Sequence, residues 1–196
     1  MMKRYAEMER TTKETKIEAT FLIDGKGLHE ISTGIPFFDH MLILFSVHGF
    51  FDLTVKAVGD LEVDYHHTVE DVGLVLGELL NKSLGDRKGI RRYGFAQIPM
   101  DDAMSSVTID LSNRPFLVYG LPDNLERQPE AHANLFKEFF RALTNRAGMN
   151  LHILTQYGTN DHHVTESIFK AFARSLDQAT SIDSRIEDIH SSKGLL

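Results

Sequence analysis

Two short segments of the sequence share one pattern, in which two adjacent histidines are followed three residues later by a glutamate. The residues concerned are His66, His67, Glu70, His162, His163 and Glu166. At that spacing an imidazole and a carboxylate lie on one face of a helix, as the ligands of one cation must. Adjacent histidines point in different directions, so two nearby cations explain each pair better than one. Imidazole and carboxylate without thiolate suit Mn²⁺, Fe²⁺, Zn²⁺ or Co²⁺.

A single segment of this kind is also compatible with surface histidines at a helix start. Two copies about half a chain apart favour an internal duplication instead. Before each copy lies a helical pattern ending near a glycine, Gly49 or Gly148, then an alternating strand. We therefore predict an α+β fold of two similar halves, each strands–helix–strand–helix, with helices on one face of mostly antiparallel sheets. The predicted halves are residues 1–92 and 93–196.

The duplication also suggests further ligands on the helices that precede the histidine pairs. His40 and Glu138 occupy corresponding places in the two halves. His40 lies in an apolar segment, where a hydrogen-bonded core histidine is the alternative. The predicted metal ligands are then His40, His66, His67, Glu70, Glu138, His162, His163 and Glu166. Four ligands for each of two ions leave positions open for substrate or water. His48 either faces this site or caps its helix.

Composition narrows the class of protein. The formal net charge of −7 argues against nucleic acid or an anionic membrane as the main partner. No apolar stretch approaches the roughly 20 residues that span a bilayer, and the charged N-terminal segment does not resemble a signal peptide. Cysteine is absent, which excludes a disulfide framework and zinc–thiolate sites. We expect a soluble, cytoplasmic protein.

Longer segments resemble one family along nearly the whole chain. They are RTTKETKI, FFDHM, DYHHTVEDVGLVLG, KGIRRYG, IDLSNRPFL, GTNDHHVTESIFKAFARSL and a terminal SSKG. The sequence is similar here to imidazoleglycerol-phosphate dehydratases. That resemblance implies a hydro-lyase of histidine biosynthesis that converts imidazole glycerol phosphate to imidazole acetol phosphate. It also implies two Mn²⁺ ions per active site, with other divalent metals as alternatives, and a homo-oligomer of 24 subunits with active sites at subunit interfaces.

The resemblance assigns roles to individual residues. The proton-transfer candidates are Glu14, Glu70, Glu166 and His48, which the sequence does not rank. The candidates for substrate binding are Glu14, His48, Arg92, Arg114, Lys170, Ser191, Ser192 and Lys193. Without the resemblance, Glu14 would be read as a strand-surface residue, and Arg114 and the tail as loop and terminus. The eight predicted ligands coincide with the metal positions of the family.

Two departures from the family pattern affect the expected site. Glu138 stands where many members carry histidine, so the metal affinity or preference is expected to differ. Ile43 and Leu44 replace a polar pair, which puts substrate contacts from those positions in doubt. Two rival functions are also compatible with the sequence. One is a dinuclear hydrolase acting on a phosphorylated metabolite, and the other is a non-enzyme in which metal only holds subunits together.

Overall fold

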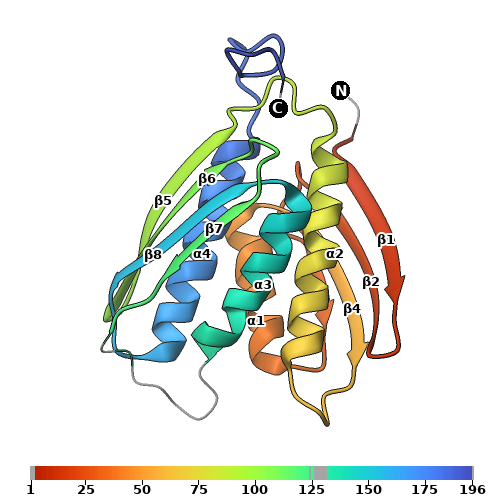
Figure 1. The fold of residues 1–196 in the computed structure, drawn as a ribbon, viewed down its shortest axis with the longest axis vertical. Coiled ribbons are helices and arrows are strands. Elements are labelled where there is room, and N and C mark those ends of the chain that lie inside the picture. The colour runs from red at the N-terminus through yellow and green to blue at the C-terminus, as the bar shows by residue number, and fades with distance from the viewer. Residues whose placement is uncertain (1–2, 124, 126–131, 196) are drawn as a thin grey trace.

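The computed structural model describes residues 3–123, 125 and 132–195. Two sheets lie on the outside with helices packed between them (Figure 1). In the first half the elements are β1 (Tyr5–Thr11), β2 (Thr15–Leu22), β3 (His29–Ser32), α1 (Pro36–Gly49), β4 (Asp52–Gly59) and α2 (His66–Leu84). The strand order is β1-β2-β4-β3, antiparallel except that β3 runs parallel to β4.

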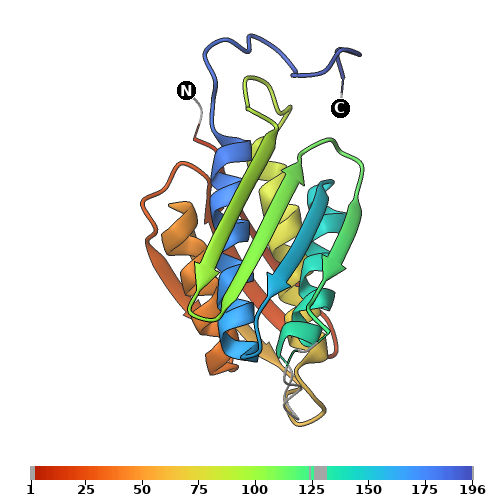
Figure 2. The same ribbon diagram turned by 90° about the vertical axis from the view of Figure 1, so that its left-hand side faces the viewer.

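The second half repeats this arrangement. Its elements are β5 (Tyr93–Met100), β6 (Ala103–Asp110), β7 (Phe116–Gly120), α3 (His132–Ala147), β8 (Asn150–Tyr157) and α4 (Asp161–Thr180). The order β5-β6-β8-β7 again has one parallel pair, β7 with β8. Figure 2 shows the second sheet from outside, with the helices behind it. The predicted α+β fold of two similar halves is confirmed.

Period-two burial explains why each sheet covers the helices with one face only. In β2 the side chains of Ile17, Ala19 and Phe21 are buried while their neighbours face outward. In β6 the side chains of Val107 and Ile109 do the same. Alternation of this kind gives a strand one apolar and one polar face. The apolar faces of both sheets therefore close over a single core that the two halves share.

Contacts between helices cross from one half to the other. α2 packs along α3, and α1 packs along α4. The approach of α2 to α3 is close because α2 carries Gly73 and Gly77 on the contact face. A Cβ added at Gly73 would lie 2.6 Å from the carbonyl oxygen of Phe139, and one at Gly77 would lie 2.5 Å from that of Leu143. Only glycine permits this spacing, and the helices it brings together carry predicted ligands.

The starts of α2 and α4 are fixed by polar groups beside the histidine pairs. At α4, the Asn160 side chain accepts hydrogen bonds from the backbone N–H groups of His162 and His163, an N-cap that fixes the first turn. At α2, the Asp64 carboxylate accepts from the backbone N–H of His66. Both helices begin at the same end of the molecule, the lower end in Figure 1. In the part of the chain that the structure describes, no helix has the length and apolarity needed to cross a bilayer.

Candidate active site

Three predicted ligands from different halves meet at the start of α4. We name His40, His162 and Glu166 the α4 cluster; potential ligand atoms of the three lie within 4.8 Å of one another. The Nε2 atom of His40 lies 3.0 Å from Oε1 of Glu166, and Nε2 of His162 lies 2.9 Å from the same oxygen. His40 comes from the first turns of α1, so the cluster depends on the packing of α1 against α4. Two imidazoles and one carboxylate can bind a divalent cation.

A second group of three forms at the start of α2. We name His66, Glu70 and Glu138 the α2 cluster, and its potential ligand atoms also lie within 4.8 Å of one another. Nε2 of His66 lies 3.1 Å from Oε2 of Glu70. Glu138 comes from α3 and forms an ion pair with Arg141 one turn further along that helix. Each cluster therefore combines a histidine-pair helix from one half with a helix from the other half.

The remaining two predicted ligands, His67 and His163, face other carboxylates. The ring of His67 is inclined at 87° to that of His66, and Nδ1 of His67 lies 3.0 Å from Oδ2 of Asp60. Nδ1 of His163 lies 2.6 Å from Oδ1 of Asp102. A carboxylate at Nδ1 fixes the orientation of an imidazole whose Nε2 atom can bind a metal. At His163 this Nε2 atom lies 3.4 Å from Oδ2 of the exposed Asp101.

Neighbouring groups keep the carboxylates of the site ionised. Burial raises the pKa of Glu166, but hydrogen bonds from Lys170, His40 and His162 outweigh it and lower this pKa to about 2. Asp102 accepts backbone hydrogen bonds from Thr159 and Asn160 as well as the bond from His163, and these hold its pKa well below the usual range. Both groups therefore carry a negative charge at neutral pH, as a cation site requires.

Lys170 and His48 lie beside the α4 cluster. Nζ of Lys170 lies 2.6 Å from Oε2 of Glu166, so one oxygen of that carboxylate faces the imidazoles while the other binds the ammonium group. The pKa of His48 is lowered by burial first and then by the positive charges of Lys170 and Arg174. These effects outweigh the opposite effect of Glu166 and favour the neutral imidazole, which has one unprotonated ring nitrogen.

Glu14 lies in the tight turn between β1 and β2, outside both clusters. Its backbone carbonyl accepts a hydrogen bond from the N–H of Asp60, the residue that holds His67. Its negative charge is close enough to contribute to the raised pKa of His67, after the larger effect of the hydrogen bond with Asp60. Within the described part of the chain, the Glu14 carboxylate has no hydrogen-bond or ion-pair partner. It is thus a free carboxylate beside the metal-binding end of α2.

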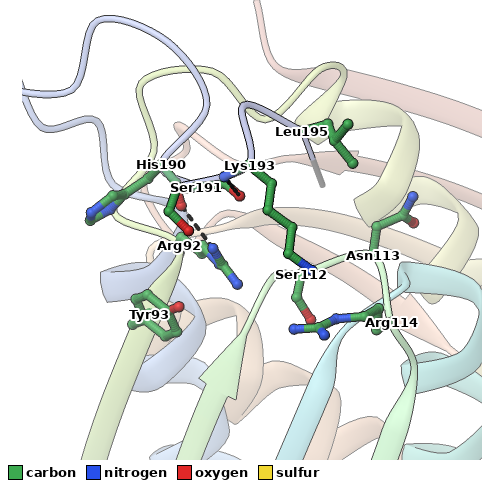
Figure 3. A pocket seen from close by; sticks show the side chains of 10 residues that line it. Arg92, Tyr93, Ser112, Asn113, Arg114, His190, Ser191, Lys193 and Leu195 are labelled. Atoms are coloured by element: carbon green, nitrogen blue, oxygen red, sulfur yellow. Dashed lines mark hydrogen bonds between the residues drawn. The ribbon is translucent and has the colours of Figure 1, made fainter.

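Five of the predicted substrate-binding residues line a cavity of about 580 Å³ at the opposite end of the molecule. They are Arg92, Arg114, Ser191, Ser192 and Lys193, joined there by Tyr93, Ser112, Asn113, His190 and Leu195. Figure 3 shows the Lys193 side chain extending toward Ser112 and Arg114. Guanidinium, ammonium and hydroxyl groups around one cavity suit a phosphate group. We name this cavity the anion pocket.

Asp110 shapes the anion pocket but was not among the residues predicted from the sequence. Its two carboxylate oxygens accept hydrogen bonds from Nε and Nη2 of Arg92, at 2.6 Å and 3.1 Å. The Nη1 atom of Arg92 donates to the carbonyl oxygen of His190 at 2.8 Å and so ties the C-terminal tail to the sheet. Asp60, Asp102 and Arg141 were missed as well. Asp110 does lie in the segment IDLSNRPFL that carried the resemblance, which was the available signal.

The anion pocket and the metal clusters are far apart within one chain. The backbone N–H of Arg92 donates to the carbonyl oxygen of Ala179, near the end of α4, whereas His162 lies in its first turn. A rise of about 1.5 Å per residue separates His162 from Ala179 by about 25 Å. Lys170 lies with the α4 cluster and does not line the anion pocket. The anion pocket is therefore distant from the predicted metal ligands of α4.

The chain is similar to known enzymes along its length. The family model described as imidazoleglycerol-phosphate dehydratase matches residues 33–176. The chain is 59% identical over 195 residues to the imidazoleglycerol-phosphate dehydratase of Desulfosudis oleivorans, covering 100% of both chains. It is 52% identical over 195 residues to that of Geobacter sulfurreducens, again covering 100% of both.

Solved structures with the same fold carry the same name. The imidazoleglycerol-phosphate dehydratase of Staphylococcus aureus superposes with a TM-score of 0.81 at 36% identity, covering 91% of this chain and 99% of that one. That of Pyrococcus furiosus, solved in complex with (S)-C348, gives a TM-score of 0.83 at 35% identity, covering 96% and 100%. From the duplicated histidine segments to the arrangement of both sheets, the chain belongs to the imidazoleglycerol-phosphate dehydratase family.

Proposed function

We propose that this chain dehydrates imidazole glycerol phosphate with the help of two divalent cations, at active sites assembled from neighbouring copies of the chain. Membership of the family makes it a hydro-lyase of histidine biosynthesis. The observation that carries the metal dependence is the convergence of imidazoles and carboxylates from different helices into the α2 and α4 clusters.

The donor set supports Mn²⁺ as the cation, two per active site. Both clusters combine imidazole nitrogen with carboxylate oxygen, and the chain has no cysteine to favour a softer metal. His67 and His163, held at Nδ1 by Asp60 and Asp102, are the groups that would complete the two sets of ligands. When bound, the cations would orient the imidazole of the substrate and stabilise the negative charge that develops on it.

Proton transfer is best assigned to Glu14. Glu70 and Glu166 are committed to the clusters, and a carboxylate with a pKa of about 2, as at Glu166, is a weak base. Glu14 has no such commitment and lies on the turn joined to Asp60. His48 is unprotonated beside the α4 cluster and is the second group able to accept a proton. Both are proposed to contact the substrate as well.

The phosphate of the substrate is proposed to bind in the anion pocket. Arg114 and Lys193 supply positive charge, and the hydroxyl groups of Ser191 and Ser192 supply hydrogen bonds. Arg92 is already paired with Asp110 and tied to the carbonyl of His190, so its main contribution is to hold the tail in place. Lys170 would contact substrate at the metal end, through its position beside Glu166.

The distance between the two regions supports an active site built from more than one chain. A small phosphorylated imidazole cannot reach from the clusters to the anion pocket across about 25 Å of α4. The metal end of one copy must therefore meet the anion pocket of another. Exposed apolar side chains on the outer face of the second sheet, such as Phe95, Phe116 and Leu154, offer surface for such contacts. We also propose that the protein forms the 24-subunit assembly and has the cytoplasmic location that the resemblance implies.

The test is turnover of imidazole glycerol phosphate by protein loaded with Mn²⁺. We expect the acetol product without release of inorganic phosphate, loss of activity on chelation, and recovery when Mn²⁺ is restored. Release of inorganic phosphate would instead indicate a hydrolase. Bound metal and an intact assembly without turnover would indicate a purely structural role.

Substitution of a ligand sharpens this test. His67→Ala is expected to lower turnover by more than about 100-fold, because loss of a ligand should cost more than loss of a residue that only orients a ligand. Circular dichroism should show that the fold is retained. His29→Ala is the matched control, because His29 is exposed at the start of β3, away from both clusters, the anion pocket and the outer face of the second sheet. Wild-type turnover by His67→Ala would contradict the assignment.

A further inference from the structure

We infer that the two cation sites of this chain are chemically unequal, so that Zn²⁺ displaces Mn²⁺ from the site on the α4 cluster before it does so from the site on the α2 cluster. The inference rests on the proposed function only in assuming that each cluster holds a cation. Each site then has its own preference between Zn²⁺ and Mn²⁺, and Glu138 is the residue that makes the two preferences differ.

The two clusters occupy corresponding places in the duplicated chain but differ in their donor atoms. The α4 cluster offers two imidazoles and one carboxylate, whereas the α2 cluster offers one imidazole and two carboxylates. Glu138, which takes the place of His40, is the whole of this difference. His67 and His163 are both histidines, so the imbalance persists when one of them joins each cation.

The charges around the clusters differ in the same direction. In the α4 cluster, Glu166 is paired with Lys170, which leaves one carboxylate against one ammonium group. The corresponding position four residues after Glu70 is Leu74, which has no charge. In the α2 cluster, Arg141 pairs with Glu138 and leaves the charge of Glu70 uncompensated. The α4 cluster is thus formally neutral, and the α2 cluster carries one net negative charge.

The carboxylates that follow the histidine pairs also differ in solvent access, while the histidines of the two clusters are similarly exposed. The Glu166 side chain is 8% exposed, whereas that of Glu70 is 34% exposed. Carboxylate oxygen and water suit Mn²⁺, while imidazole suits Zn²⁺. Zn²⁺ binds more tightly than Mn²⁺ to sites of nitrogen and oxygen in general, so both sites should exchange. The oxygen-rich and negatively charged α2 cluster, with its more exposed Glu70, should retain Mn²⁺ longer.

The experiment is a metal competition on the intact protein. Protein loaded with Mn²⁺ is titrated with Zn²⁺, and released Mn²⁺ is followed by electron paramagnetic resonance. We expect release in two phases of equal size, separated in Zn²⁺ concentration by at least about tenfold. Tenfold is the lower end of the change in metal affinity that follows substitution of a residue beside a metal ligand. Anomalous diffraction from a half-exchanged crystal should place Zn²⁺ at the α4 cluster. A single phase, or Zn²⁺ at the α2 cluster first, would overturn the inference.

Variants assign the effect to Glu138. Glu138→His should merge the two phases into one by making the donor sets equal. Glu78→His makes the same change on the exposed side of α2 and should leave both phases intact. Arg141→Gln keeps every ligand and makes the net charge of the α2 cluster more negative. It should therefore widen the separation in Zn²⁺ concentration between the two phases. This variant tests the inference even if Glu138→His fails to fold. Failure to bind Mn²⁺ at all would overturn the proposed function itself, whereas two bound Mn²⁺ released together would overturn only this inference.

Discussion

The histidines of each pair have different partners. His66 and His162 point into the clusters, while His67 and His163 are held at Nδ1 by Asp60 and Asp102. The two aspartates come from different loops. Asp102 belongs to the hairpin between β5 and β6, and the corresponding hairpin of the first half, between β1 and β2, carries Glu14 instead. Because Asp60 orients His67 from the loop after β4, the Glu14 carboxylate is available for the proton transfer that we propose.

Removal of the Asp102 charge should weaken metal binding without removing a ligand. Asp102→Asn is expected to lower the affinity for Mn²⁺ by about 10- to 100-fold, since the carboxylate that orients His163 is lost. Titration of metal-free protein with Mn²⁺, followed by the resonance of the free ion, measures this change. Asp86→Asn is the control, because Asp86 is exposed beside Lys88 and remote from both clusters. Equal affinities for the two variants would show that Asp102 has no positioning role.

Among the elements, α2 and α3 determine whether the α2 cluster forms. Glu138 reaches His66 and Glu70 only because the two helices pack closely, and Gly73 and Gly77 set that spacing. A larger side chain at either glycine must move backbone, since the nearest atoms are carbonyl oxygens of Phe139 and Leu143. Stability and the geometry of the metal site therefore depend on the same contact.

The close packing reverses the usual effect of replacing a helical glycine. Helix propensity alone predicts that Gly73→Ala stabilises by about 1 kcal/mol. Overpacking against Phe139 is expected to cost about 1–3 kcal/mol and to outweigh it. Urea denaturation of metal-free protein should show net destabilisation, accompanied by weaker Mn²⁺ binding. Lys82→Ala, exposed on the same helix, serves as the control. Increased stability of Gly73→Ala would mean that the helices are not held this closely.

The whole molecule presents two functional ends, with the metal clusters at one and the anion pocket at the other. In the function that we propose, each end of the chain supplies half of a site, and copies of the chain combine to complete it. The outer face of the second sheet lies uncovered within a single chain and is available for this contact (Figure 2). Activity should consequently depend on assembly as well as on the residues of each chain.

Mixed assemblies test this dependence directly. His67→Ala and Arg114→Ala are each expected to be inactive, because one damages the metal end and the other the anion pocket. Dissociation and reassembly of the two variants together should restore part of the activity, since some sites then combine an intact metal end with an intact anion pocket. Each variant dissociated and reassembled alone is the control. If both ends of one chain served the same site, the mixture would stay inactive.

Much of the site follows from local sequence. The spacing of His67 and Glu70, and of His163 and Glu166, indicates a helical face on its own, because helical geometry is periodic over a few residues. Repetition of that spacing predicted the duplicated α+β fold, which the sheets confirm. The quoted segments also identified the family and hence the reaction.

Other features depend on contacts between residues distant in sequence. The pairing of His40 with Glu166 across the halves, the hydrogen bond of Asp102 to His163 and the separation of Lys170 from Arg114 have no local pattern. Periodicity shows which face of a helix is apolar, but not which other helix covers that face. The packing of α1 on α4 and of α2 on α3 decides that, because only burial of both faces in one core brings these side chains together.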